Sequence, residues 1–237
     1  MLTGEARTPE GMRLYAIGDI HGCDVKLAAV HAAIAADLAE RPTSDHRFIH
    51  IGDYGDRGPD SAGVTARLIG MAGDPRVINL RGNHDQKWLD FLADPAGAAP
   101  TFLSFGGKAT LRSYGVGNRA RNYEGLAAIM IEKMPASHRA FLEGLRLSAR
   151  FGDYFFAHAG IRPGVPLEAQ TAEDLMWIRE EFLLDRRDHG VVVVHGHTVT
   201  ARQTPEVHPN RIAIDTGAVF DGPLTCVVLG GRDVRFL

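Results

Sequence analysis

The chain has 237 residues, of which 45% are hydrophobic and 23% are charged, and its formal net charge is -3. This length and composition can bury a large core, and we expect one domain over residues 1–237. The near balance of acidic and basic residues gives no sign of a nucleic-acid or membrane partner. Residues 1–11 lack the basic and apolar regions of a signal peptide, so we expect a cytoplasmic protein that starts with a flexible tail.

Five short apolar runs, rich in β-branched or aromatic residues, predict strands that are buried on both faces. Each run stops at a Gly, Asp, Asn or His. Because ligands bind beyond the carboxyl ends of strands in α/β sheets, we expect the five polar endings to converge on one rim. The runs are residues 14–17, 48–51, 77–80, 154–157 and 191–194.

Helical patterns alternate with these runs, which indicates an α/β fold. Asp24 is placed to cap a first helix, and a second helix begins near Asp60. Residues 86–150 are mainly helical and too long for a simple connection, so we interpret them as an insertion near the active site, where loops commonly determine substrate choice. The last third returns to strands from Phe151 onward, and their close spacing predicts partly antiparallel sheets.

The polar endings form five short motifs. They are Gly18-Asp19-Ile20-His21-Gly22, Gly52-Asp53-Tyr54-Gly55-Asp56-Arg57-Gly58, Gly82-Asn83-His84-Asp85, His158-Ala159-Gly160 and Gly196-His197-Thr198. Divalent cations take carboxylate, amide oxygen and imidazole ligands, and these motifs offer all three without a thiolate. The pattern therefore indicates a site for two metal ions.

The motif residues divide between the two expected ions. We assign Asp19 and His21 to the first ion because their alternate spacing places both side chains on the same side of an extended segment. Asp53 can use both carboxylate oxygens and is the expected bridge. The other expected ligands of the second ion are Asn83, His158 and His197. Two ions about 4 Å apart can share a hydroxide, which would attack phosphorus in line.

Phosphoester hydrolysis also requires groups that bind the phosphoryl oxygens and a group that protonates the leaving oxygen. Arg57 and Arg179 are expected to bind the phosphoryl oxygens, together with Asn83. The leaving oxygen needs a proton, and His84 is placed to donate it as the general acid. Asp56 could hold the other nitrogen of that imidazole and so fix its tautomer.

The motifs resemble those of the metal-dependent phosphoprotein phosphatases, in their bacterial branch, within the calcineurin-like metallophosphoesterases. Both order and spacing agree, over residues 19–22, 52–58, 82–85, 158–160 and 196–198. The resemblance implies a four-layer α/β/β/α sandwich of two mixed sheets. It also implies a site charged with manganese, or with Fe, Zn, Ni or Co, and a phosphorylated protein, peptide or small phosphoester as substrate.

Two alternatives remain open. Symmetrical dinucleoside tetraphosphate hydrolases share the first motif, the Gly-Asn-His-Asp motif and an ending similar to residues 214–217. They typically carry Ala at the position of Asp56 and Trp at that of Thr198. Because a pyrophosphate leaving group needs little protonation, Asp56 favours a phosphoester substrate. The other alternative, a noncatalytic phosphate-binding module, has little support because the expected ligands and His84 are all present.

Two further residues, His195 and Lys108, allow two interpretations each, and a third, Asp215, is expected to have no catalytic role. His195 precedes His197 by two residues and is either a contact of the site or a hydrogen-bonded histidine at a strand end. Lys108 could reach an anionic substrate from the insertion, although an exposed lysine is the simpler interpretation. Asp215 is expected in a turn at the rim and receives no catalytic role. The sequence leaves the oligomeric state and the preference among Ser, Thr and Tyr open.

Overall fold

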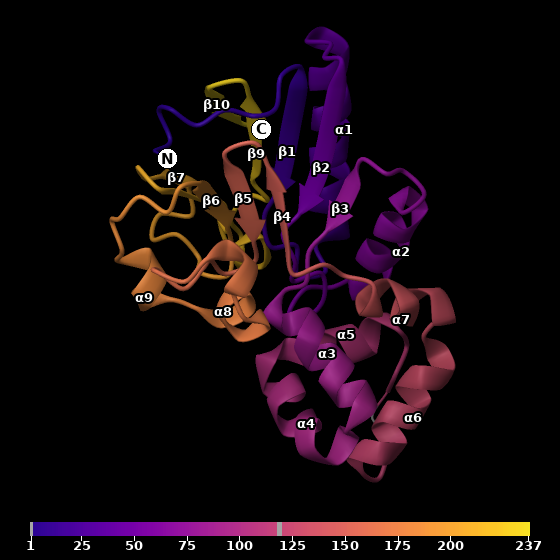
Figure 1. Cartoon of the computed structure of the whole chain (residues 1–237). Coiled ribbons are helices and arrows are strands. Elements are labelled where there is room, and N and C mark those ends of the chain that lie inside the picture. The colour runs from indigo at the N-terminus through magenta and orange to yellow at the C-terminus, as the bar shows by residue number, and fades with distance from the viewer. Residues whose placement is uncertain (1, 118–119) are drawn as a thin grey trace.

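The computed structural model describes residues 2–117 and 120–237, and in them the chain forms two five-stranded mixed sheets (Figure 1). In the first sheet, three parallel strands from the start of the chain pair with an antiparallel hairpin from its end. Their order in space is β10 (Asp233–Phe236), β9 (Cys226–Gly230), β1 (Met12–Ile17), β2 (Asp45–His50) and β3 (Val77–Asn79).

The second sheet has three parallel strands in its middle and an antiparallel strand at each edge. Its order is β4 (Ser148–Phe151), β5 (Tyr154–Ala157), β6 (Val192–His195), β8 (Arg211–Ala213) and β7 (Glu206–Val207). The strand expected from Phe151 onward is therefore a hairpin. Its turn contains Gly152 at φ +59°, a left-handed conformation that glycine adopts without steric cost.

Alternating side chains along the strands produce four layers. Leu14 and Ala16 of β1 lie in a core between the two sheets, whereas Tyr15 and Ile17 face the helices on the other side. The outer face of the second sheet likewise packs on helices through a separate apolar cluster. The outer layers are α1 (Asp24–Glu40) and α2 (Ser61–Met71) on the first sheet, and α8 (Ala172–Trp177) and α9 (Glu180–Leu183) on the second. The expected α/β/β/α sandwich is confirmed.

The helical insertion lies beyond the strand ends and packs against α2 (Figure 1). It consists of α3 (Asn83–Ala93), α4 (Pro95–Phe102), a kinked segment (Leu103–Gly107) in which Gly106 is not helical, α5 (Lys108–Ser113), α6 (Tyr123–Lys133) and α7 (Ala136–Glu143). Its helices begin before residue 86 and end before residue 150, because β4 already belongs to the second sheet. Among the described residues, no helix combines the length and apolarity that crossing a membrane requires.

Two local expectations are corrected by the structure. Residues 2–11 are attached to the body of the protein: Ala6 is fully buried, and the Thr8 N–H donates to the Gly231 carbonyl at 3.0 Å. Asp24 lies in the first turn of α1 rather than at its N-cap. Its two carboxylate oxygens instead accept from the Arg67 guanidinium at 2.7 and 2.8 Å, which ties α1 to α2.

Candidate metal centre and active site

The polar residues of the motifs leave their strands through sharp turns. Of the seven non-glycine residues with positive φ among the described residues, five lie here. They are His21, Asp53, Asp56, Arg57 and His197, with φ from 45° to 67°. Such conformations cost about 1–3 kcal/mol each and cluster at functional sites. These turns follow β1 and β2 of the first sheet and β6 of the second, so the strand ends of both sheets contribute to one rim.

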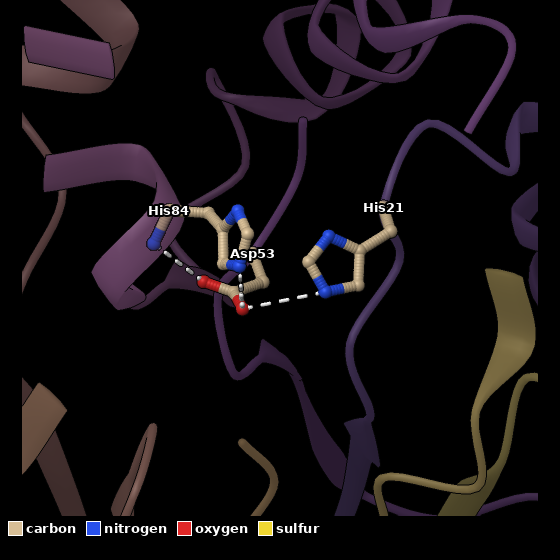
Figure 2. A group of neighbouring side chains, drawn as sticks. All are labelled: His21, Asp53 and His84. Carbon is tan, nitrogen blue, oxygen red and sulfur yellow. Dashed lines mark hydrogen bonds and ion pairs between the residues drawn. The ribbon is translucent and has the colours of Figure 1, made fainter. Parts of the chain in front are cut away.

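Asp53 lies at the centre of the cluster and is buried (Figure 2). Its Oδ2 atom is 3.5 Å from Nε2 of His21 and 4.0 Å from Nε2 of His84. Its Oδ1 atom is 3.4 Å from Nε2 of His158, on the opposite side. The two oxygens of one carboxylate therefore face two groups of ligands, as a bridging ligand requires.

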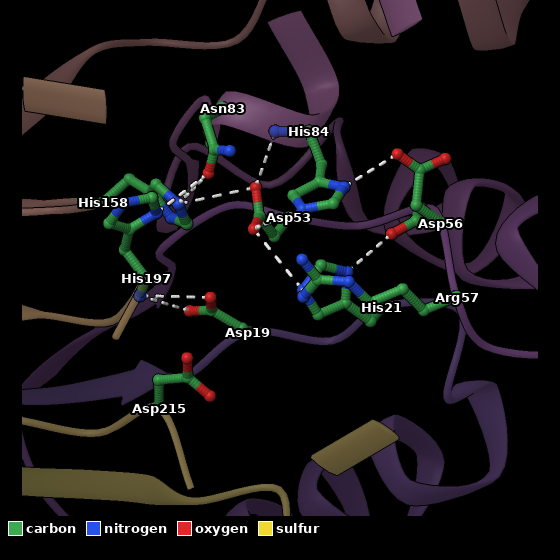
Figure 3. A network of polar contacts seen from close by, with 12 residues as sticks. Asp19, His21, Asp53, Asp56, Arg57, Asn83, His84, His158, His197 and Asp215 are labelled. Carbon is green, nitrogen blue, oxygen red and sulfur yellow. Dashed lines mark hydrogen bonds and ion pairs between the residues drawn. The ribbon is translucent and has the colours of Figure 1, made fainter. Parts of the chain in front are cut away.

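The second group of ligands surrounds Asn83 (Figure 3). Its Oδ1 atom is 2.9 Å from Nε2 of His158 and 2.9 Å from Nδ1 of His197. The His197 backbone N–H donates to Asp19 at 3.1 Å, which brings the first motif to the last one. Nε2 of His197 is buried and has no hydrogen-bond partner in the part of the chain that the structure describes, so it is available to a ligand.

The donor atoms fit two divalent ions. Two triads of ligand atoms lie within 4.8 Å of one another, His21–Asp53–His84 and Asp19–Asp53–His158, and they share Asp53. The triads group neighbouring donor atoms and do not assign ligands to individual ions, so the assignment of Asp19 and His21 to the first ion stays a prediction. Carboxylate, imidazole and amide oxygen donors without a thiolate suit Mn and related ions, although they do not select one.

Burial keeps the ligand imidazoles neutral. It lowers the pKa of His21 to about 3 and that of His197 to about 2, and it also lowers the pKa of His158. A neutral imidazole has a free lone pair, which metal binding needs. Burial by itself raises the pKa of Asp53, but the surrounding imidazoles, His158 foremost, hold it below its usual value. The imidazoles are therefore in the protonation state that metal binding needs, whereas burial and the nearby carboxylates of Asp215 and Asp53 raise the pKa of Asp19.

His84 differs from these imidazoles. Burial lowers its pKa, but the carboxylates of Asp53 and Asp56 outweigh burial and raise the pKa above its usual value. Nδ1 of His84 lies 2.8 Å from Oδ2 of Asp56, and both side chains are buried. An imidazole held by a carboxylate on one nitrogen can carry a proton on the other. The arrangement suits a general acid.

Comparison with known proteins agrees with this site. A family model of calcineurin-like phosphoesterases matches residues 12–229. The chain belongs to this family. Because relatives of this phosphoesterase include phosphatases, it is a metal-dependent phosphatase that hydrolyses phosphoesters.

Two relatives and one solved structure show how far the similarity extends. Serine/threonine-protein phosphatase 1 of Salmonella typhimurium is 31% identical over 220 residues, which cover 90% of this chain and 89% of the relative. An asymmetrical bis(5'-nucleosyl)-tetraphosphatase of Oceanobacillus iheyensis is 26% identical over 236 residues, covering 90% and 87%. A solved structure described as a putative diadenosine tetraphosphatase superimposes with a TM-score of 0.66 at 22% identity, covering 98% and 97%, and supports the fold alone.

Two acidic residues of the phosphoesterase site received no role from the sequence. Asp85 is fully buried and accepts the backbone N–H groups of Asp53, Tyr54 and Gly82 at 2.8–3.0 Å, so it fixes the turn that carries the central ligand. Its position in the Gly-Asn-His-Asp motif was the only available signal. Asp215 lies beside Asp19 (Figure 3), and burial raises its pKa to about 6. Crowded buried carboxylates favour a bound cation.

The two arginines expected at the phosphate differ in their surroundings. Nη1 of Arg57 donates to Nε2 of His21 at 2.9 Å, so this guanidinium already lies at the ligand cluster (Figure 3). Its carbon Cζ lies 5.6 Å from the ring centre of Phe220. Arg179 is exposed and contacts Thr198 at 3.4 Å, next to the last metal motif. Both side chains can approach a phosphoryl group from the rim.

The remaining two candidates lie away from the ligands. Nδ1 of His195 is 3.1 Å from the Gly196 carbonyl, and its ring packs against Phe182. This is the hydrogen-bonded histidine at a strand end. Nε2 of His195 lies 3.4 Å from Nη1 of Arg211, whereas His197 packs against His158 and Asn83. Lys108 is exposed at the start of α5.

Proposed function

We propose that this phosphoesterase is a phosphomonoester hydrolase of the protein phosphatase type. Its substrate would be a phosphorylated Ser, Thr or Tyr in a protein or peptide, or a small phosphoester. The buried pair of His84 and Asp56, 2.8 Å apart, is the main support. An alkoxide or phenoxide leaving group needs a proton, whereas a pyrophosphate leaving group needs little help. An oriented acid is therefore most useful on a phosphomonoester.

The proposed metal ligands are the carboxylates, imidazoles and amide at the strand ends. They are Asp19, His21, Asp53, Asn83, His158 and His197. When bound, two divalent ions, manganese in our proposal, supply Lewis acidity that makes a water nucleophilic at neutral pH. Arg57, Arg179 and Asn83 would hold the phosphoryl oxygens and compensate the charge that grows on them.

Proton transfer would pass through His84. Its Nδ1–H donates to Asp56, which fixes the tautomer and leaves Nε2 to face the site, 4.0 Å from Asp53. A proton on Nε2 can then move to the leaving oxygen as the bond to phosphorus breaks. Both carboxylates near His84 raise its pKa, which favours the protonated form that the first step requires.

A second candidate function is the hydrolysis of dinucleoside tetraphosphates. It is favoured by the similarity to the Oceanobacillus tetraphosphatase over 90% of this chain. This second function makes the opposite prediction for the general acid. Loss of His84 or Asp56 would have little effect on the turnover of a dinucleoside tetraphosphate, because the nucleotide product is a good leaving group.

Initial rates would separate the two functions. The panel would contain phosphopeptides, p-nitrophenyl phosphate and diadenosine tetraphosphate, each with Mn, Fe, Zn, Ni or Co. We expect the highest kcat/KM on a phosphomonoester, and Asp56→Asn should lower it on phosphopeptides about 10²-fold. A tetraphosphate rate that exceeds every monoester rate and is insensitive to Asp56→Asn would establish the second function instead.

A further inference from the structure

One residue of the helical insertion reaches the acid pair. Thr110 lies in the first half of α5 and is fully buried. Its hydroxyl donates to Oδ1 of Asp56 at 2.6 Å and accepts the Asp56 backbone N–H at 2.8 Å. Oγ of Ser61 lies 3.1 Å away and can donate to the same hydroxyl. Thr110 therefore holds both the side chain and the backbone of Asp56.

These contacts determine the orientation of the Asp56 carboxylate. The rotation of such a group about its last bond has a broad energy minimum, so one hydrogen bond does not fix its plane. Here Thr110 binds Oδ1, while Nδ1 of His84 binds Oδ2 at 2.8 Å. The two partners together leave one orientation, in which Oδ2 faces the imidazole.

The insertion also holds the turn that carries Asp56. Asp56 and Arg57 are consecutive non-glycine residues with φ of 67° and 66°, a conformation that needs support from its surroundings. The Arg57 N–H donates to the carbonyl of Gly106 at 3.1 Å. Residues from one stretch of the insertion thus bind two successive backbone N–H groups of this turn.

We propose that Thr110 is a positioning residue of the general acid: it orients Asp56 so that Asp56 orients His84. This inference rests on the proposed phosphomonoester hydrolysis and adds a role for the insertion within it. Helix α5 supplies Thr110 to the acid relay, whereas the proposed metal ligands follow strand ends or, for Asn83, begin α3. Loss of the Thr110 hydroxyl should therefore impair protonation of the leaving group and spare metal binding.

The test compares leaving groups. Thr110→Val keeps the shape of the side chain and removes the hydroxyl, and Thr110→Ser restores the hydroxyl. On a phosphoserine peptide we expect kcat of the valine variant to fall about tenfold or more, and on p-nitrophenyl phosphate less than about threefold. The serine variant should recover most of the peptide rate. Metal content, measured by elemental analysis, should match the parent in both variants.

Two controls make the result decisive. Thr65→Val removes another buried threonine hydroxyl, one that donates to the Ser61 carbonyl at 2.9 Å and, among the described residues, has no hydrogen bond to Asp56. It should affect both substrates equally. In a His84→Asn background, Thr110→Val should cause no further selective loss, because the two residues act through one relay. If Thr110→Val does not fold, Thr110→Ala takes its place in the same comparison.

The outcomes distinguish this inference from the proposed function. Equal losses on both substrates, or no recovery with serine, would overturn the role of Thr110 while phosphomonoester hydrolysis by the parent stands. A parent protein that shows no turnover of any phosphomonoester would overturn the proposed function itself.

Discussion

The two sides of Asp53 are built in different ways. On one side, His158 and His197 follow strand ends, and a ring nitrogen of each lies 2.9 Å from Oδ1 of Asn83 at the start of α3. Their imidazoles are buried and neutral. On the other side, His84 is bound to a carboxylate that Thr110 of the insertion holds in place. The first arrangement suits metal binding, and the second suits proton donation.

The difference shows how one residue type acquires two roles in one site. Burial lowers the pKa of every imidazole in the cluster, but only His84 has two carboxylates close enough to reverse the effect. The metal side depends on the strand ends of both sheets and on Asn83 at the start of α3. The acid side also depends on Thr110 of α5, so variants should be able to impair it separately.

The largest effect is expected at Asp53, because it belongs to both sides. Asp53→Asn removes the charge that both ligand triads share. We expect loss of metal and of at least several kcal/mol of transition-state stabilisation, about 10³-fold or more in kcat. Elemental analysis and steady-state kinetics would check this. A variant that retains near-normal metal content would show that Asp53 is not the bridge.

The proximity of the side chains on the metal side was predictable, because motif order, residue type and strand ends all point to the same rim. Five runs ended in polar motifs, and Asp53, Asn83 and His158 do come together. The local backbone of the site could not be predicted. His21 and His197 adopt left-handed turns, which strand periodicity does not indicate.

The acid side was only partly predictable. The contact between His84 and Asp56 followed from their motifs, since both flank expected ligands. Thr110 gave no signal, because it is a single polar residue in a helical pattern about fifty positions from its partner. The four layers were expected from the resemblance, but strand pairing in two separate sheets depends on contacts between distant segments. Such contacts are not encoded in local periodicity.

The next largest effect is expected at His84 and should be confined to the acid side. His84→Asn removes the proton donor and keeps a polar side chain of smaller size. We expect about a 10²-fold loss of kcat on phosphoserine peptides and a much smaller loss on p-nitrophenyl phosphate, whose leaving group needs little protonation. Steady-state kinetics on both substrates would measure this. Because a ring nitrogen of His84 lies within 4.8 Å of ligand atoms of His21 and Asp53, metal content should be measured as well.

If kcat falls equally on the two substrates and the metal content falls as well, His84 acts as a metal ligand rather than as the general acid. The comparison between the two regions would then fail at its central residue.

A smaller effect is expected where the insertion approaches the turn. Gly106 has φ +106°, and a Cβ atom there would lie 2.7 Å from Cγ and 2.8 Å from the backbone nitrogen of Arg57. Gly106→Ala should therefore lower the free energy of unfolding by about 1–3 kcal/mol and weaken activity, while metal content is retained. Urea denaturation, kinetics and elemental analysis would measure the three quantities.

Gly70→Ala provides the matched control. Gly70 lies in α2, and nothing surrounds the position of its Cβ within 4 Å. Alanine should stabilise this helix by about 0.5 kcal/mol or leave it unchanged. If Gly106→Ala were as well tolerated as Gly70→Ala, the close packing of the insertion on Arg57 would have no energetic importance.

The smallest effect tests whether burial alone keeps an imidazole neutral. His50 is fully buried at the end of β2, faces His31 at 3.0 Å and lies outside the metal site. Burial lowers its pKa from 6.5 to about 3. Below pH 6.5 the unfolded chain therefore binds a proton that the folded chain does not, and stability falls as the pH falls through this window. Between pH 7 and 5 the expected contribution is about 2 kcal/mol.

His50→Gln should reduce the loss of stability between pH 7 and pH 5 by about this amount, as measured by urea denaturation at both values. Taking the difference between the two pH values cancels any change in packing that the substitution causes. His46→Gln, on the same strand but partly exposed, should change the difference less, because water solvates its charged form. An unchanged pH dependence in His50→Gln would mean that the folded protein protonates this imidazole as readily as the unfolded chain does, and burial would then not suffice to explain the neutral ligands beside Asp53.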